Sequence, residues 1–101
     1  MVKHIILWKL KDEYTPDQKR EIKKNIQTNL ESLAGQIEGL LNIRVYTDAL
    51  PSSNVDLMLD STFRDADALA EYSTHPAHVA VADAFVRPYT ATRSCFDFDT
   101  K

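Results

Sequence analysis

The chain has 101 residues, 44% of them hydrophobic and 27% charged, with a formal net charge of −3. This length fits one domain, placed at residues 1–101, and the composition excludes disordered, collagen-like and coiled-coil classes. No dense basic surface is available for phosphates, which argues against a nucleic-acid partner. No apolar run is long enough for a membrane span and no signal peptide is visible, so we expect a cytoplasmic protein without membrane contact.

Residues 2–10 are rich in strand-forming side chains and predict the first strand. Its two rows of side chains are both mainly apolar, which indicates burial on both faces of the sheet. One row holds His4, Ile6, Trp8 and Leu10, and the other holds Ile5 and Leu7.

A helix-start signature follows, in which Thr15 is the N-cap, Pro16 opens the helix and Gln18 completes a capping box. An apolar stripe at spacings of three and four residues then predicts an amphipathic helix that continues to residue 37, with its Lys and Arg side chains on a solvated face. The stripe consists of Ile22, Ile26, Leu30, Leu33 and Ile37. Gly35 and Gly39 mark the turn into the next strand.

Two strands joined by a loop come next. Leu41, Ile43 and Val45 alternate with polar residues and predict the second strand, and residues 55–63 alternate in the same way as the third. The segment 48–54 between them contains a proline and two serines, which predicts a loop.

The second helix starts near Asp65, which is placed as its N-cap. His75-Pro76 interrupts it, because a proline disfavours helical geometry in the residue before it and can itself open a new helical turn. The third short helix continues through Val79, Ala82, Phe85 and Val86, and residues 92–98 alternate as the last strand.

The order strand, helix, strand, strand, broken helix, strand is that of an α+β, ferredoxin-like split βαβ fold with an antiparallel four-stranded sheet and helices on one face. Because the helices cover only one side, we expect the faces that hold Trp8 and Phe96 to need further cover. A homodimer packed sheet to sheet would supply it and would enclose a space between the sheets.

Most familiar catalytic motifs are absent. The two glycines do not form a phosphate-binding loop, and no serine lies in a Gly-x-Ser-x-Gly elbow. Cys95, the only cysteine, cannot form an internal disulfide, and we expect a small packing residue rather than a nucleophile.

The informative cluster is the segment from Tyr72 to His78, which holds two of the three histidines. His78 follows Pro76 within the first turn of the third helix, where the partial positive charge of a helix N-terminus favours a neutral imidazole. Tyr72 offers a phenolic donor. A base and a donor together suit proton abstraction next to a carbonyl group.

Structural roles are open for the same residues. His75 is placed to cap the third helix, His4 to be a half-buried residue of the sheet, and Tyr72 and His78 to form a satisfied hydrogen-bonded pair. Pro76 lies between the two neighbouring histidines and no cysteine accompanies them, which disfavours a metal site.

Three segments carry a family resemblance. The opening Val2-Lys3-His4 with its apolar run, the signature Tyr72-x-x-His75-Pro76-x-His78 and the closing Cys95-Phe96-Asp97-Phe98 resemble the stress-responsive A/B barrel (Dabb) domain. The resemblance spans the whole chain and implies a dimeric α+β barrel.

The resemblance implies a stress-response protein of unassigned role that binds a small hydrophobic or carbonyl-containing molecule in a barrel pocket, with His4, His75 and Trp8 as binding residues. The family includes a plant polyketide cyclase, so the alternative is a lyase that catalyses intramolecular aldol condensation with His78 as base and Tyr72 as proton donor. Related barrels also include cofactor-independent or haem-handling monooxygenases, a third alternative that rests on fold analogy. We expect no cofactor and no metal.

Overall fold

The computed structural model describes residues 1–101. Along the chain the elements are β1 (Val2–Leu10), α1 (Pro16–Glu31), β2 (Leu40–Tyr46), β3 (Leu57–Phe63), α2 (Ala66–Thr74), α3 (Pro76–Val81), the π-helical turn η1 (Ala82–Val86) and β4 (Thr90–Asp99). The strands form one sheet in the order β2-β3-β1-β4, and all neighbouring pairs are antiparallel.

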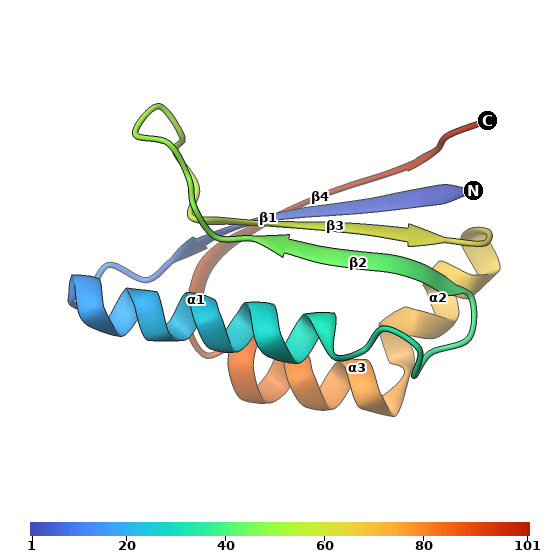
Figure 1. Ribbon diagram of the computed structural model, residues 1–101, viewed down its shortest axis with the longest axis horizontal. Helices are drawn as coiled ribbons and strands as arrows, with labels where there is room; N and C mark the ends of the chain where they lie inside the picture. The colour runs from blue at the N-terminus through green and yellow to red at the C-terminus, as the bar shows by residue number, and fades with distance from the viewer.

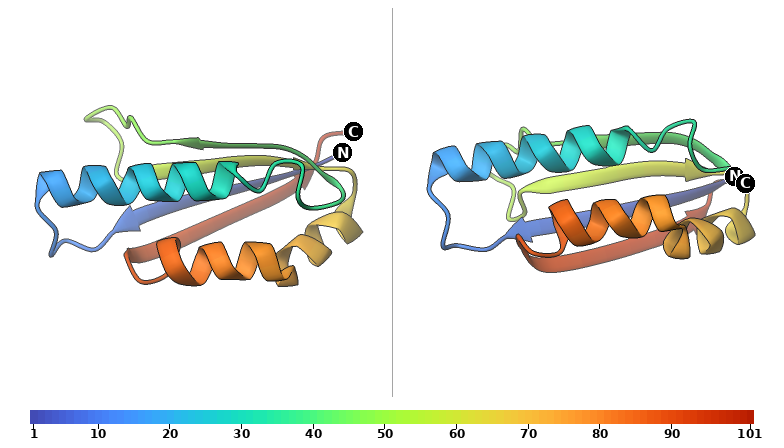
Figure 2. Two further views of the ribbon diagram at one scale, coloured as in Figure 1. Left: turned by 60° about the horizontal axis from the view of Figure 1, so that its bottom comes forward. Right: turned by 90° about the horizontal axis from the view of Figure 1, so that it is seen from below.

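The helices lie on one side of this sheet (Figure 1). Seen from the helical side, α1 lies over the half of the sheet that contains β2 and β3, and α3 lies over the half that contains β1 and β4 (Figure 2). The predicted ferredoxin-like α+β fold is therefore confirmed. None of the helices combines the length and the apolarity that a membrane span requires.

The start of α1 is the predicted one. The Thr15 hydroxyl accepts a hydrogen bond from the backbone N–H of Gln18 at 3.2 Å, and the Gln18 side chain accepts one from the backbone N–H of Thr15 at 2.9 Å. This capping box satisfies two N–H groups that the first turn leaves without partners. Ile22, Ile26 and Leu30 are buried against the sheet, and each contributes about 1.5–3 kcal/mol through burial of its side chain.

The predicted end of this helix at residue 37 is wrong, because α1 ends at Glu31. The Ser32 hydroxyl donates to the carbonyl of Asn29, and a series of turns follows that includes Gly35 at a φ of +80°. Leu33 and Ile37 are still buried. The apolar spacing therefore indicates which residues contact the core, and Leu33 and Ile37 make this contact from turns rather than from a helix.

The predicted alternation on β2 is wrong at its first residue. The pairing of β2 with β3 shifts between Leu40 and Asn42, so that Leu40 is buried and Leu41 is 54% exposed. Such an irregularity inserts one residue into the ladder and exchanges the faces of its neighbours.

Alternation along β1 divides the sheet into a covered face and an open face. His4 and Trp8 point to the helices and are buried, so the prediction that Trp8 needs cover from outside is wrong. Ile5 pairs with Phe96 on the opposite side, and Phe96 is 66% exposed. The apolar residues of the open face are Ile5, Leu7, Tyr46, Met58, Phe96 and Phe98.

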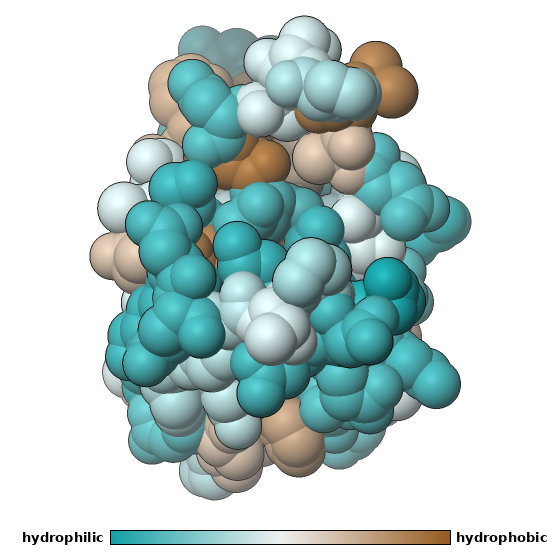
Figure 3. Space-filling view, turned by 90° about the vertical axis from the view of Figure 1, so that its left-hand side faces the viewer, coloured by the Kyte–Doolittle hydropathy of each residue, from teal (hydrophilic) through white to brown (hydrophobic).

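Hydrophilic side chains dominate the end of the molecule where α1 begins (Figure 3). A few hydrophobic residues lie among hydrophilic ones toward the top of this view, which is the side away from the helices. On the face of the sheet away from the helices, Phe96 and Phe98 are exposed.

The two glycines provide a matched test of packing. Both have positive φ, but a Cβ on Gly39 would lie 2.5 Å from the Cβ of Ala68 in α2, whereas a Cβ on Gly35 would meet nothing within 4 Å. We expect Gly35→Ala to lower the free energy of unfolding by about 1–2 kcal/mol through its backbone conformation alone. Gly39→Ala should lose about 1–3 kcal/mol more through overlap with α2. Urea denaturation measures both, and equal losses would contradict the close approach at Gly39.

Candidate functional site

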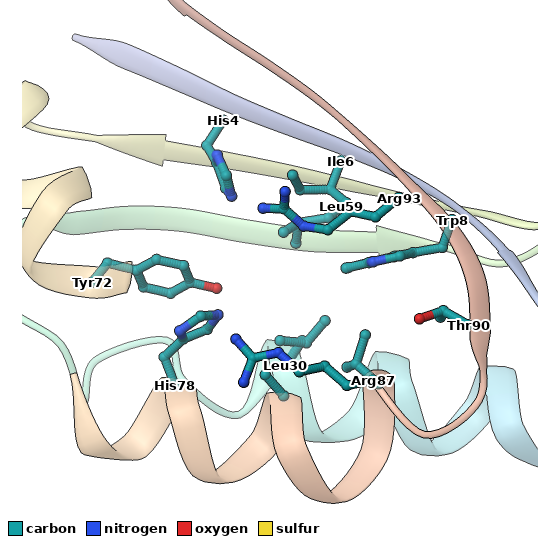
Figure 4. A pocket seen from close by; sticks show the side chains of 12 residues that line it. His4, Ile6, Trp8, Leu30, Leu59, Tyr72, His78, Arg87, Thr90 and Arg93 are labelled. Atoms are coloured by element: carbon teal, nitrogen blue, oxygen red, sulfur yellow. The ribbon is translucent and has the colours of Figure 1, made fainter. Parts of the chain in front are cut away.

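A cavity of about 290 Å³ lies between the sheet and the helices of the chain. β1 contributes one row of its side chains, and α2, α3 and η1 form the opposite wall (Figure 4). The lining residues are His4, Ile6, Trp8, Leu30, Leu59, Tyr72, His78, Ala82, Val86, Arg87, Thr90 and Arg93.

Tyr72 and His78 meet at one end of this cavity. Their ring centroids are 4.2 Å apart with an interplanar angle of 35°, and the Tyr72 hydroxyl points into the open space (Figure 4). The Tyr72 Oη and the His78 Nδ1 are both buried without a hydrogen-bond partner. The predicted alternative of a satisfied pair is therefore wrong for these two atoms. A ligand in the cavity would be their natural partner, because buried polar groups are nearly always hydrogen-bonded.

The environment keeps both side chains neutral near pH 7. Burial raises the pKa of Tyr72 above its usual value, and the positive charge of Arg93 offsets this only in part. Burial lowers the pKa of His78, the Ser73 carbonyl opposes the change, and the charges of Arg87, His4 and Arg93 reinforce it. The neutral imidazole expected from the sequence is thus supported, although burial and nearby charge account for it rather than the helix N-terminus.

His4 lies across the cavity from this pair. Its Nδ1 is 2.5 Å from the Asp97 Oδ1, so the carboxylate holds the ring through that nitrogen and the Nε2 is the nitrogen left for the cavity. The ring is 6.1 Å from that of Tyr72 between centroids. The structure therefore brings His4 to the same space as Tyr72 and His78.

His75 is the one predicted binding residue that does not line the cavity. Its Nδ1 accepts a hydrogen bond from the backbone N–H of Ala77 at 3.1 Å, and its extended backbone ends α2 and caps α3. This is the capping role that the sequence left open. Trp8, in contrast, forms part of the cavity wall.

Cys95 is exposed on β4 rather than packed, which corrects the sequence expectation. Its Sγ lies 3.4 Å from the Asp97 Oδ1 and 3.9 Å from the His4 Nδ1. Partial desolvation of the sulfur and the neighbouring Asp97 raise the pKa of the thiol, which disfavours the reactive thiolate. Ligand atoms of His4, Cys95 and Asp97 lie within 4.8 Å of one another, a donor set that zinc uses, but the His4–Asp97 hydrogen bond already accounts for the closest pair.

Arg87 was missed in the sequence because it follows an irregular turn. Its backbone N–H donates to the carbonyl of Ala82, five residues earlier, at 2.8 Å. In a regular α-helix, Arg87 would lie about 140° round the axis from Ala82, at about 100° per residue. The wider turn of η1 places Arg87 nearly above Ala82, and both line the cavity.

Arg93 was missed for a different reason. It pairs with Trp8 across β1 and β4, so it belongs to the row of β4 on the helix side of the sheet together with Cys95 and Asp97, although all three residues are exposed. The alternation of β4 already separated Arg93 from Phe96 and Phe98. What the sequence left undetermined is which of these rows faces the helices.

Comparisons with known proteins agree with this fold. A family model described as "Stress responsive A/B Barrel Domain" matches residues 2–100. Olivetolic acid cyclase of Cannabis sativa is 29% identical over 97 residues, which cover 96% of this chain and 94% of the relative. An uncharacterized protein of Streptomyces coelicolor is 36% identical over 84 residues, which cover 79% of this chain and 81% of that protein.

Among solved structures, a dimeric protein of unknown function with a ferredoxin-like fold from Bacteroides fragilis is similar, with a TM-score of 0.90 and 30% identity. The match covers 97% of this chain and 94% of that one.

The unpartnered hydroxyl of Tyr72 leads to a prediction about stability. Tyr72→Phe removes a buried polar group that has no partner, so we expect the free energy of unfolding to stay the same or to rise by up to about 1 kcal/mol. Ser61→Ala is the control, because the buried Ser61 hydroxyl donates to the carbonyl of His4 at 3.0 Å and its loss should cost about 0.5–1.5 kcal/mol. Urea denaturation of both variants gives the comparison, and a clear loss for Tyr72→Phe would show that its hydroxyl is bonded in the protein.

Proposed function

The chain belongs to the stress responsive A/B barrel domain family, and we propose that it is a homodimer in which each chain binds a small carbonyl-containing molecule in its own cavity. The observation that carries this proposal is the pair of buried polar atoms without partners, the Tyr72 Oη and the His78 Nδ1, at one end of a mainly apolar space. Few, well-placed polar groups in an apolar pocket are typical of small-molecule sites.

The two side chains suit a carbonyl group. A neutral phenol donates a hydrogen bond, so Tyr72 holds the carbonyl oxygen. The adjacent imidazole of His78 accepts a proton from the carbon next to that carbonyl, and the Tyr72 hydroxyl stabilises the resulting enolate. Trp8 and Leu30 provide an apolar wall for the rest of the molecule.

The second candidate is a polyketide-cyclase-like lyase. A relative over nearly the whole chain is named olivetolic acid cyclase, and proton removal by His78 is the first step that an intramolecular aldol condensation needs. The carbanion then attacks a second carbonyl carbon of the same molecule and forms the new C–C bond. Tyr72 donates a proton to the oxygen that becomes negative.

A haem-handling monooxygenase is not supported. The cavity of about 290 Å³ lies at the lower end of the range of about 300–1,000 Å³ for small-molecule sites, which is small for a macrocycle. A cofactor-independent monooxygenase rests on fold analogy alone, without an observation at the site in its favour.

Proton removal is tested with ethyl 3-oxohexanoate in D₂O. NMR measures the rate at which deuterium replaces the hydrogens at C2 of this molecule. We expect the protein to accelerate exchange above the buffer background, and His78→Ala to lower this acceleration by about 100-fold or more, as is usual for loss of a general base. Because the pKa of His78 lies below its usual 6.5, the wild-type rate should rise with pH through that lower value and be constant at pH 7. Arg93→Gln removes a charge that lowers this pKa and should move the midpoint upward.

His75→Asn is the matched control for the exchange experiment. It changes a histidine outside the cavity and keeps a side chain able to cap α3. Its exchange rate should equal that of the wild type. If the wild type shows no acceleration, or if His78→Ala retains it, the proton-transfer role is wrong.

The homodimer is proposed from the open face of the sheet. Ile5, Leu7 and Phe96 lie on this face with nothing above them in one chain, and a second copy packed face to face would remove them from water. The similar protein from Bacteroides fragilis is described as dimeric. A domain of this length gains a large part of its possible core by such association.

We expect Phe96→Glu to give a monomer, because the charge would be buried without a partner at the centre of the interface. Light scattering coupled to size exclusion measures the mass. Leu50→Glu is the control, since Leu50 is 72% exposed in the loop between β2 and β3 and should leave the dimer intact. A monomeric wild type, or a dimeric Phe96→Glu variant, would contradict this interface.

A further inference from the structure

We infer that the cavity selects a keto acid, a carbonyl compound whose ionised carboxylate is held by Arg93 with help from Arg87. This inference rests on the proposed binding function and adds to it the chemical class of the ligand. The assignment comes from the charges that line the cavity and from the directions in which its side chains point.

The side chains that line the cavity include two arginines, and the nearest carboxylate on the sheet side is that of Asp97, which is hydrogen-bonded to His4. No Asp or Glu is among its lining residues, whereas the whole chain has a formal net charge of −3. Arg87 is neutralised in part by an ion pair with Asp83, one turn earlier. Arg93 forms no ion pair with any carboxylate of the chain. Both arginines are exposed residues, and the guanidinium of Arg93 has no carboxylate partner within the chain.

Both guanidinium groups point toward the same end of the cavity. Figure 4 shows that of Arg93 close to His4 and that of Arg87 close to His78. The charges of both arginines lower the pKa of His78, which agrees with this proximity. An anion at this end would lie beside Tyr72 and His78.

A carboxylate is the anion that fits the donors and the space. The planar guanidinium offers two parallel N–H groups that match the two oxygens of a carboxylate. The other end of the cavity holds Trp8 and Thr90, and Leu30 lies between this end and His78 (Figure 4), so the indole and the leucine offer apolar surface to an alkyl tail. The ligand is thus oriented with its acid group and its carbonyl toward Tyr72 and His78 and with its tail toward Trp8.

Trp8 supplies the measurement. It is the only tryptophan of the chain and lines the cavity, so its fluorescence reports occupancy. The probes are 5-oxodecanoate and its methyl ester, which share the ketone and the alkyl tail and differ in the charge. We expect the wild type to bind the acid at least about tenfold more tightly than the ester, as a charge-assisted hydrogen bond allows. Added NaCl should weaken binding of the acid and leave that of the ester unchanged.

Two variants of Arg93 and one control variant test whether Arg93 binds the carboxylate. Arg93→Gln should weaken binding of 5-oxodecanoate about tenfold or more and change that of the ester less than about twofold. Arg93→Lys keeps the charge without the two parallel donors and should lie between. Arg20→Gln removes an exposed arginine of α1 outside the cavity and should bind both probes as the wild type does.

The outcomes separate the two proposals. Equal affinity of the wild type for acid and ester overturns the keto-acid assignment and leaves the proposed binding function standing. If Arg93→Gln loses affinity for both probes equally, the assignment is also overturned, because Arg93 would then act by packing. If neither probe changes the fluorescence of Trp8, the binding function fails and the assignment fails with it.

Discussion

The break at Pro76 is the constraint on which the candidate site depends. Residues 72 and 78 are six positions apart, and in one continuous helix they would point about 120° apart around the axis, at about 100° per residue. Proline instead holds His75 in an extended conformation, with φ −64° and ψ 132°, so α2 ends and α3 starts in a new direction. Tyr72 at the end of one helix and His78 at the start of the next thereby stack 4.2 Å apart.

In this arrangement the Tyr72 Oη and the His78 Nδ1 make no hydrogen bond within the protein, so a ligand would be their partner. The same apolar surroundings leave the Tyr72 hydroxyl unpaired, raise its pKa and lower that of His78. A donor that stays protonated and a base that stays neutral are thus produced by one environment. The positive charges of Arg87 and Arg93 lower the pKa of His78 further. The charge of Arg93 also offsets part of the rise in the pKa of Tyr72.

The sequence predicted the elements and the Tyr72–His78 pair because both depend on local signals, namely caps, alternation and one proline. It could not predict where α1 ends, because Leu33 continues the apolar stripe of the helix although it lies in the turn that follows. It also missed the arginines. Arg87 follows a π-helical turn that the sequence did not predict, and the side of Arg93 depends on which face of the sheet the helices cover. These are tertiary choices that no local pattern encodes.

The site and the proposed interface share one pair of strands. Along β1, His4 faces the cavity and Ile5 faces outward, and their partners on β4 are Asp97 and Phe96. A shift of β4 by one residue would exchange these rows, so the register that points Phe96 toward a second chain also points Asp97 at His4. β4 is an edge strand that only β1 pairs, and a second chain on the open face would hold it in that register. Assembly on the open face would therefore be coupled to the geometry of the site through the backbone, although the cavity itself is formed by one chain.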